Sequence, residues 1–274
     1  MDFKNFLIIE KGISPYQAQC YLYTIESFRS KYPGESKDDI MEFYISYLNG
    51  DYSKSTIRNI AFALNRFSEY RGIDFSIKPP KKNKTKIQYL KKEDVYKMLC
   101  QFSSYRDISL FLLMVQAGLR VSEVSKLNLD DLYFKNDDGY ILLKDTKNRE
   151  DWKVYLMEDT ISLIQSYIAL ERDNSIKNKA LFLTRRNTRI STRAIQNTIK
   201  KAGDSIGVKV HPHMLRHTCA TQMRINGADI DTIKNQLRHR SYESTQIYIH
   251  AVDEVQKTNY KKYALSIAQD FDVK

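Results

Sequence analysis

The sequence contains few residues that interrupt helices or strands, with 9 Gly and 5 Pro among 274 residues, and few that could form disulfides, with 3 Cys. It also has a single Trp. That composition excludes a collagen-like, low-complexity or disulfide-stapled protein. Cys20, Cys100 and Cys219 are odd in number, widely spaced and form no CxxC pair, which favours reduced thiols. The longest apolar run, residues 109–119, has about half the length of a membrane span. The start MDFKNFLIIEKG lacks the basic, apolar and small-residue regions of a signal peptide, so we expect a soluble cytoplasmic protein without membrane contact.

What the sequence has in excess is positive charge. The 44 Lys and Arg outnumber 33 Asp and Glu, which gives a net charge of +11 and a pI near 9.3. Residues 1–80 contain 10 basic and 10 acidic side chains, so the whole excess follows residue 80. This distribution is compatible with an ordinary basic protein, but it also indicates a polyanionic partner. With 42% hydrophobic residues, the chain is long enough for one large or two ordinary folded domains.

Residues 1–77 read as a small helical domain. Apolar residues recur at helical spacing within 14–29, 38–50 and 53–72, and turn residues separate these ranges. We expect Asp38 or Asp39 to cap the second helix. Nothing in this part resembles a catalytic constellation.

Residues 78–86, KPPKKNKTK, predict an extended basic linker. Two prolines remove backbone donors, and the closely spaced lysines repel one another. The segment is either a solvated connector or an arm that lies along a phosphate backbone. Either interpretation places a domain boundary here, followed by a second domain at residues 87–274.

The second domain is predicted to be mostly helical with one small sheet. Residues 140–143 and 152–156 read as two short strands, joined by a polar turn at 144–151. Helical patterns cover residues 91–102, 109–118, 160–170, 192–201, 213–226, 229–237, 244–249 and 253–267. The fold class expected for the whole chain is therefore mainly α with a small antiparallel sheet.

Two basic residues stand where they could serve a site. Arg120 follows the turn residue Gly118 at the end of an apolar helix, and Glu123 is near enough in sequence to orient it. As plain structure this is a surface ion pair. Lys147 lies at the tip of the predicted hairpin, where it is either solvated or delivers a proton to a site built elsewhere.

Histidines and a tyrosine complete the candidate set. A helix that starts at Pro212 puts His213 and Arg216 on one face, where they could bind a phosphate. A zinc site at His211, His213 and His217 is disfavoured, since no Cys or carboxylate completes it at the usual spacing. His239 and Tyr248 are unexceptional when each is considered alone.

Together these residues resemble the tyrosine recombinase (phage integrase) family. The matching segments are AGLRVSE with Arg120, TKNREDWKVYL with Lys147, HPHMLRHT with His213 and Arg216, LRH with His239, and TQIYIH with Tyr248. The resemblance spans roughly residues 87–260, and the helical domain and basic linker before it resemble the family's core-binding (SAM-like) domain and connector. It implies a mostly helical catalytic domain with a small antiparallel sheet.

The resemblance also implies a reaction. Tyr248 would attack a DNA phosphodiester, form a 3′-phosphotyrosyl bond and release a 5′-hydroxyl. Arg120 and Arg216 would bind the non-bridging oxygens, and His239 would donate a further hydrogen bond. His213 would accept the tyrosine proton and Lys147 would protonate the departing 5′-oxygen. No cofactor, metal ion or ATP is expected.

Three residues depart from the family pattern. Arg238 stands where Gly is usual, Met214 where Asp is common, and Tyr155 where Pro often follows the hairpin. Arg238 would either add a phosphate contact or crowd the site. Lys144 is close enough to Lys147 to be an alternative match for the lysine.

The expected partner is double-stranded DNA, bound by a homo-oligomer of four protomers on two sites, with an accessory or directionality protein as a further partner. The apolar residues after Tyr248 predict a helix that docks on its own domain or, as the resemblance implies, on a neighbouring protomer. The simple domain arrangement resembles the Xer group or a small mobile-element integrase, so the outcome would be integration, excision or resolution of DNA multimers. A type IB topoisomerase would share the chemistry, and a non-catalytic DNA-binding regulator is the alternative outside enzymes.

Overall fold

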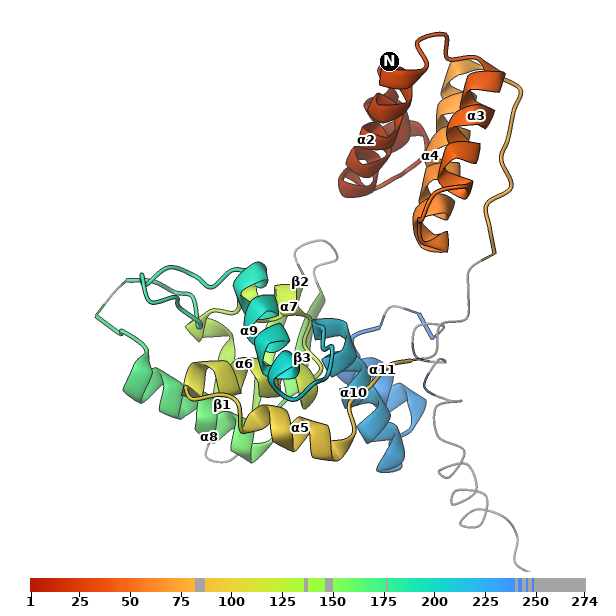
Figure 1. The fold of residues 1–274 in the computed structure, drawn as a ribbon. Coiled ribbons are helices and arrows are strands. Elements are labelled where there is room, and N and C mark those ends of the chain that lie inside the picture. Colours follow the sequence, from red (N-terminus) through yellow and green to blue (C-terminus); the bar gives the residue numbers. More distant parts are fainter. Residues whose placement is uncertain are drawn as a thin grey trace, which may run out of the picture. The chain divides into compact units, whose positions relative to one another are not determined.

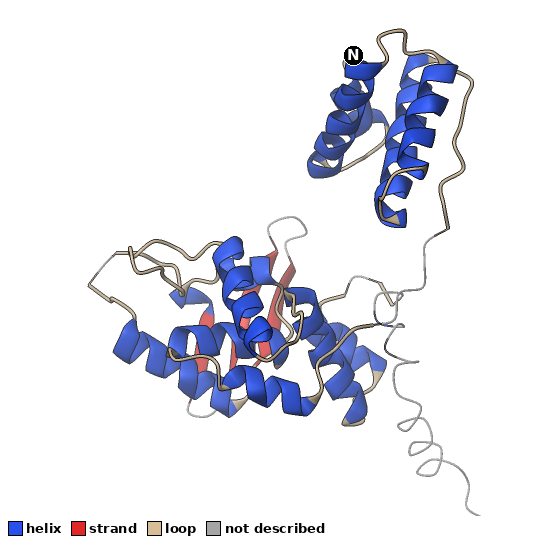
Figure 2. Cartoon of the chain, in the orientation of Figure 1, coloured by secondary structure: helices blue, strands red, loops and turns tan. Residues whose placement is uncertain are grey.

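The computed structural model describes residues 1–81, 87–135, 138–145, 150–175 and 177–239, together with 241, 242, 245 and 248 (Figures 1 and 2). The chain divides into two compact units, Met1–Lys86 and Ile87–Lys274. Helices predominate and the described strands form one three-stranded antiparallel sheet. The fold class expected from the sequence, mainly α with a small antiparallel sheet, is confirmed.

The first unit is a bundle of three longer helices preceded by a short helical segment. Its elements are α1 (Phe3–Asn5), the π-helix η1 (Phe6–Glu10), α2 (Pro15–Lys31), α3 (Lys37–Leu48) and α4 (Lys54–Arg71). Ser14 and Ser53 accept hydrogen bonds from the first turns of α2 and α4, as expected of caps. The predicted cap of α3 was wrong. Ser36 caps that helix, and its hydroxyl and the Asp39 carboxylate each accept the other residue's backbone N–H.

Aromatic side chains hold this bundle together. Phe28 of α2 lies against Phe43 of α3 and Phe67 of α4, with ring centroids 5.4 and 5.8 Å apart, and all three are fully buried. Burial of one such side chain contributes about 1.5–3 kcal/mol. The apolar stripes read from the sequence are therefore core positions.

The segment that leaves α4 stays attached to it. Gly72 ends the helix with φ +68°, a conformation that glycine adopts without a Cβ penalty. The side-chain amide of Asn65 then bonds with the backbone N–H and C=O of Ile77 at 2.7 and 2.8 Å, and Arg58 donates to the carbonyl of Pro80 at 2.7 Å. Residues 78–81 belong to no helix or strand, and the rest of the predicted linker, 82–86, lies outside the described residues.

The second unit contains the sheet and seven α-helices within its described residues. Its elements are α5 (Lys92–Leu99), α6 (Tyr105–Val115), α7 (Val121–Lys126), the 3₁₀-helix η2 (Leu129–Asp131), β1 (Leu132–Lys135), β2 (Asp138–Asp145), β3 (Glu150–Tyr155), α8 (Glu158–Ser166), the π-helix η3 (Tyr167–Glu171), α9 (Thr192–Ser205), α10 (Pro212–Ile225) and α11 (Ile230–Leu237).

Helix α6 is the centre of this unit. Every residue from Ser109 to Val115 is buried, and the helix contacts α7, α8, α9 and α10 (Figure 1). A helix that is apolar on all sides requires such a position. This accounts for the longest apolar run of the sequence, and none of the described helices has the length and apolar character needed to cross a membrane.

The sheet has the order β1-β2-β3, and the sequence predicted β2 and β3 but not β1. Ile141 pairs with Val154 and both are fully buried, so this face of the sheet belongs to the core. The intervening residues of the strands face the other side of the sheet, where Tyr133, Tyr140 and Tyr155 are paired across the three strands. Helix α11 contacts β3, which brings the hairpin strands next to the candidate site.

Candidate active site

The structure brings together five of the six residues singled out from the sequence. Their positions are Arg120 at the start of α7, His213 and Arg216 in α10, His239 just after α11, and Tyr248 beyond it. Each lies within electrostatic range of Arg216 or is Arg216 itself. Lys147, the sixth, lies outside the described residues.

The turn before Arg120 requires glycine. Gly118 has φ +68°, and a Cβ there would lie 2.4 Å from the Cδ2 atom of Leu237 and 3.2 Å from Sγ of Cys219. The turn thus lets α6 end against α10 and α11 with no side chain between them. Its carbonyl accepts a hydrogen bond from Arg216 at 2.5 Å, so the turn positions two arginines at once.

Helix α10 supplies the second arginine. His211 is its cap, since Nδ1 accepts the backbone N–H of Met214 at 3.2 Å, and Pro212 is the first helical residue, as predicted. His213 and Arg216 are therefore one turn apart. Arg216 is 4% exposed and also donates to the carbonyl of Leu237 at the end of α11. Burial, with the nearby arginines, lowers the pKa of Arg216 to about 10, so it remains a cation at neutral pH.

The Arg238 side chain pairs with Glu123, a contact that the sequence did not predict. It ends α11 with φ +56°, its side chain is 5% exposed, and it donates to Oε2 of Glu123 at 2.7 Å. The same carboxylate accepts the backbone N–H and the guanidinium of Arg120 at 2.7 and 2.8 Å. Burial by itself raises the pKa of Glu123, but Arg238 and the donors of Arg120 outweigh it and hold the pKa below its usual value. Glu123 thus remains a carboxylate shared between two arginines.

His239 lies beside the tyrosine. Its Nδ1 atom is 2.8 Å from the Thr245 hydroxyl, and its ring is nearly parallel to that of Tyr248 at a centroid distance of 6.4 Å. Burial, followed by the nearby arginines, lowers the pKa of His239 to about 4. The ring is therefore neutral at pH 7, and a hydroxyl that donates to Nδ1 leaves the proton on Nε2, which can then act as a donor.

Tyr248 is 1% exposed, and its hydroxyl is 2.7 Å from Nδ1 of His217. Burial raises the pKa of Tyr248 to about 12, although Arg216 opposes the shift. The sequence predicted His213 as the tyrosine's proton acceptor, but the structure gives the hydrogen bond to His217 and leaves His213 exposed. The sequence pattern suggests His217 only as a member of the zinc alternative. The only feature of the sequence that could have indicated a role for His217 in this site is its position directly after Arg216.

The histidines of the zinc alternative have other contacts. His211 caps α10 and His217 contacts Tyr248, as described above. No group of three His, Cys, Asp or Glu side chains suited to a metal ion occurs in the described part of the chain. Cys219 is buried, its thiol donates to the carbonyl of Gln116 at 2.9 Å, and burial raises its pKa to about 12. It is an unreactive thiol.

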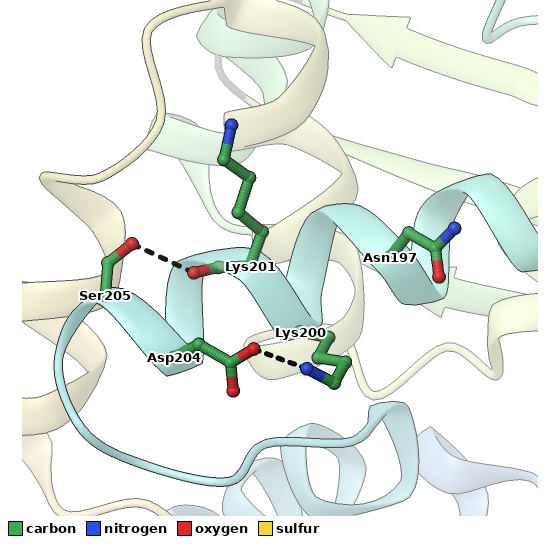
Figure 3. A pocket seen from close by; sticks show the side chains of 5 residues that line it. All are labelled: Asn197, Lys200, Lys201, Asp204 and Ser205. Atoms are coloured by element: carbon green, nitrogen blue, oxygen red, sulfur yellow. Dashed lines mark hydrogen bonds and ion pairs between the residues drawn. The ribbon is translucent and has the colours of Figure 1, made fainter.

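A surface hollow beside α9 contains none of these residues. It is lined by Asn197, Lys200, Lys201, Asp204 and Ser205, all from α9 (Figure 3). Lys200 and Asp204 form an ion pair at 2.5 Å, and the Ser205 hydroxyl donates to the carbonyl of Lys201. These contacts are local to one helix, and the hollow lacks the convergent groups of a site.

The site combines fixed cations with one phenol. Arg120 and Arg238 pair with the single carboxylate of Glu123, and two backbone carbonyls hold Arg216, so the cluster retains positive charge in a partly buried place. Such a cluster favours an anion, and its effect is stronger than in open water. A tyrosine hydroxyl next to it is a nucleophile suited to attack on a phosphorus atom.

Comparison with known proteins identifies the family of the chain. A family model described as "Phage integrase family" matches residues 88–254. The chain is 30% identical to tyrosine recombinase XerA of Thermococcus onnurineus (strain NA1) over 253 residues, covering 90% of this chain and 88% of that protein. A crystal structure of XerA recombinase matches with 26% identity and a TM-score of 0.59, covering 96% and 97% of the two chains. The Tn1549 transposon integrase in complex with transposon right end DNA has a similar fold, with 18% identity, a TM-score of 0.70 and coverage of 96% and 98%.

Proposed function

This chain belongs to the phage integrase family and is a site-specific DNA recombinase, and on that premise we propose that it cuts and rejoins double-stranded DNA through a 3′-phosphotyrosyl intermediate. The observation that carries the proposal is the position of Tyr248. Its hydroxyl lies inside the cluster of Arg216, His217 and His239, where a phosphate would meet cations and a nucleophile together.

The attack is a displacement at phosphorus. The Tyr248 oxygen forms a bond to phosphorus while the bond from phosphorus to the 5′-oxygen breaks, so the ester is exchanged and its energy is retained for rejoining. Because Tyr248 is 1% exposed, a phosphodiester reaches its oxygen only after neighbouring groups move. We propose that binding of DNA causes that movement.

The arginines hold the reacting phosphate. Arg216 uses two donors on the carbonyls of Gly118 and Leu237, which fix the guanidinium and leave further donors for the non-bridging oxygens. Arg120 is held by Glu123 and supplies a second planar set of donors. Fixed donors of this kind offset the charge that develops in the transition state.

The remaining predicted residues complete the proton transfers. His239 donates to a non-bridging oxygen, since its pKa leaves it neutral with one N–H. Lys147 protonates the departing 5′-oxygen, and His213 lies at the exposed edge of the site, where it contacts the phosphate.

The partner is double-stranded DNA. The excess of positive charge lies after residue 80, in the linker and the unit that contains the site. The Tn1549 integrase has a similar fold and is described in complex with transposon DNA. We propose that residues 1–77 and 87–274 each bind the duplex and that four protomers act on two sites. The predicted helix within residues 251–274, which lies outside the described residues, would link them. The outcome would be integration or excision of a mobile element, or resolution of DNA multimers.

The test is formation of a covalent adduct. Purified protein in EDTA is incubated with a nicked suicide duplex, chosen by selecting randomised DNA for binding, and resolved on a denaturing gel. Wild type should give a slowly migrating protein–DNA adduct, and Tyr248→Phe should give none. Tyr242→Phe is the matched control, because its hydroxyl donates to Asp231 on the surface at 2.7 Å. Tight DNA binding without an adduct would favour the regulator instead, and exchange between two sites separates a recombinase from a topoisomerase.

A further inference from the structure

The proposed mechanism leaves one contact of the Tyr248 hydroxyl unused. Nδ1 of His217 lies 2.7 Å from that oxygen, and the two rings are 5.8 Å apart at a tilt of 55°. His217 follows Arg216 in α10, so the helix that positions the phosphate-binding guanidinium also positions this imidazole. The helix therefore holds His217 in a fixed relation to the phosphate-binding arginine.

The phenol needs a proton acceptor. Burial raises the pKa of Tyr248 to about 12, so its hydroxyl carries a proton at neutral pH. A phenol becomes a good nucleophile only as that proton leaves. An acceptor must lie within hydrogen-bond distance of the oxygen, and an imidazole nitrogen at 2.7 Å meets this condition.

His217 is in the right state to accept it. Burial lowers the pKa of His217, and the neighbouring histidines and Arg216 lower it further, so the ring is neutral at pH 7. With its proton on Nε2, Nδ1 presents a lone pair to the hydroxyl. The same orientation makes the phenol the donor and the imidazole the acceptor.

The other two histidines of the site are placed for different contacts. His239 lies parallel to the Tyr248 ring at 6.4 Å, and its Nδ1 is occupied by the Thr245 hydroxyl. His213 is exposed at the start of α10. Among the described histidines, His217 is the one with a hydrogen bond to the Tyr248 hydroxyl.

We propose that His217 is a catalytic residue that takes the proton of the Tyr248 hydroxyl as the tyrosine attacks the phosphodiester. This inference rests on the proposed function. In cleavage, the proton moves from Oη to Nδ1 while the phosphorus–Oη bond forms and the phosphorus–5′-oxygen bond breaks. In religation, a 5′-hydroxyl attacks phosphorus and returns its proton to the group that protonated the 5′-oxygen during cleavage, while the tyrosine oxygen leaves and takes its proton from the imidazolium.

Two suicide duplexes separate this step from protonation of the leaving group. One has the natural 5′-oxygen at the cut, and the other has sulfur there, which departs without a proton because thiols are far more acidic than alcohols. Loss of the leaving-group acid slows only the oxygen substrate. Loss of the group that accepts the tyrosine proton slows the reaction of both duplexes.

The informative variant is His217→Asn, whose amide occupies the place of Nδ1 without its basicity. We expect adduct formation to slow about 100-fold or more on both duplexes, a typical effect of a lost general base. His211→Asn is the matched control, because it is the same change at a neighbouring exposed histidine and Asn also caps helices well. It should leave adduct formation close to wild type. His217→Ala should be slow and should regain adduct formation when free imidazole is added.

The outcomes are distinguishable. Adduct formation by His217→Asn at the wild-type rate would overturn the proposal, and a faster rate would show that the hydrogen bond restrains the phenol. Slow reaction of His217→Ala without recovery in imidazole, in a protein that still binds DNA, would reduce His217 to a packing role. Failure of the wild type on both duplexes would refute the proposed function, and this inference with it.

Discussion

Replacement of Arg238 by glycine tests how the site's buried charges are balanced. Arg238 stands where the family usually has Gly, and its side chain is 5% exposed against a Glu123 side chain that is 21% exposed. Loss of one partner from a buried ion pair costs about 3–5 kcal/mol, because the other charge remains buried. Glu123 keeps Arg120, so we take the lower limit of about 3 kcal/mol.

The same change relieves strain in the backbone. Arg238 has φ +56°, and a residue with a Cβ in that region costs about 1 kcal/mol relative to glycine. The expected net loss is therefore about 2 kcal/mol of unfolding free energy. For a unit of 188 residues this corresponds to a decrease in Tm of about 4–8 °C. Arg238→Ala, which loses the pair and keeps the strain, should be less stable again by about 1 kcal/mol.

Trp152, the single tryptophan, lies in β3 and reports on this unit alone. Melts followed by its fluorescence should give the order wild type, Arg238→Gly, Arg238→Ala. The pKa of Glu123 is lowered in the folded state, so the stabilisation is complete above its ordinary value of 4.5 and is lost as pH falls through the lower folded value. The difference between wild type and Arg238→Gly should shrink in that acidic range. A glycine variant as stable as the wild type at neutral pH would refute the reasoning.

Three further predictions follow from the same site and linker. Gly118→Ala should lower the stability of the second unit by about 1–3 kcal/mol more than Gly207→Ala, since both have positive φ but only the first brings a Cβ within 2.4 Å of Leu237; equal losses in the same fluorescence melt would contradict the close approach. His239 has a folded pKa of about 4, lowered first by burial, so its contribution to stability is complete above 6.5 and is lost as pH falls towards 4. His239→Gln should flatten that part of the stability profile, and an unchanged profile would show that folding does not lower the pKa of His239. Lys81→Gln should reduce the slope of log affinity for DNA against log salt by about 1 if the linker follows the phosphate backbone, and an unchanged slope would favour the solvated connector.

Much of the fold could be read from local patterns. The helix starts near Ser14 and at either Ser53 or Ser55, the stop at Gly72 and the start of α10 at Pro212 depend on residues within one turn of the helix end. The cap of α3 was misplaced because a serine and two acidic residues compete within four positions, and only the hydrogen bonds identify Ser36 as the cap. Strand β1 was missed because four residues, Leu132–Lys135, are too few to show alternation.

In the candidate site, the sequence likewise predicted the residues but not the contacts between them. The residue types and their order predicted Arg120, His213, Arg216, His239 and Tyr248, because each lies in a short segment whose composition is distinctive. The contacts between these residues could not be predicted in the same way. A hydrogen bond between His217 and Tyr248 joins residues 31 positions apart, and the bond from Arg238 to Glu123 spans 115 positions.

The sequence by itself therefore determined that the chain is mainly helical and basic and that its motifs resemble those of the tyrosine recombinases. Only the tertiary structure decided that the unusual Arg238 pairs with the partly buried carboxylate of Glu123 and that His217 contacts the Tyr248 hydroxyl. The physical reason is the distance along the chain over which each kind of interaction acts. Helix periodicity, caps and motif composition act over a few residues, whereas burial and long-range contacts depend on how α6, α10 and α11 pack, and that packing sets both the partners and the pKa values of the site.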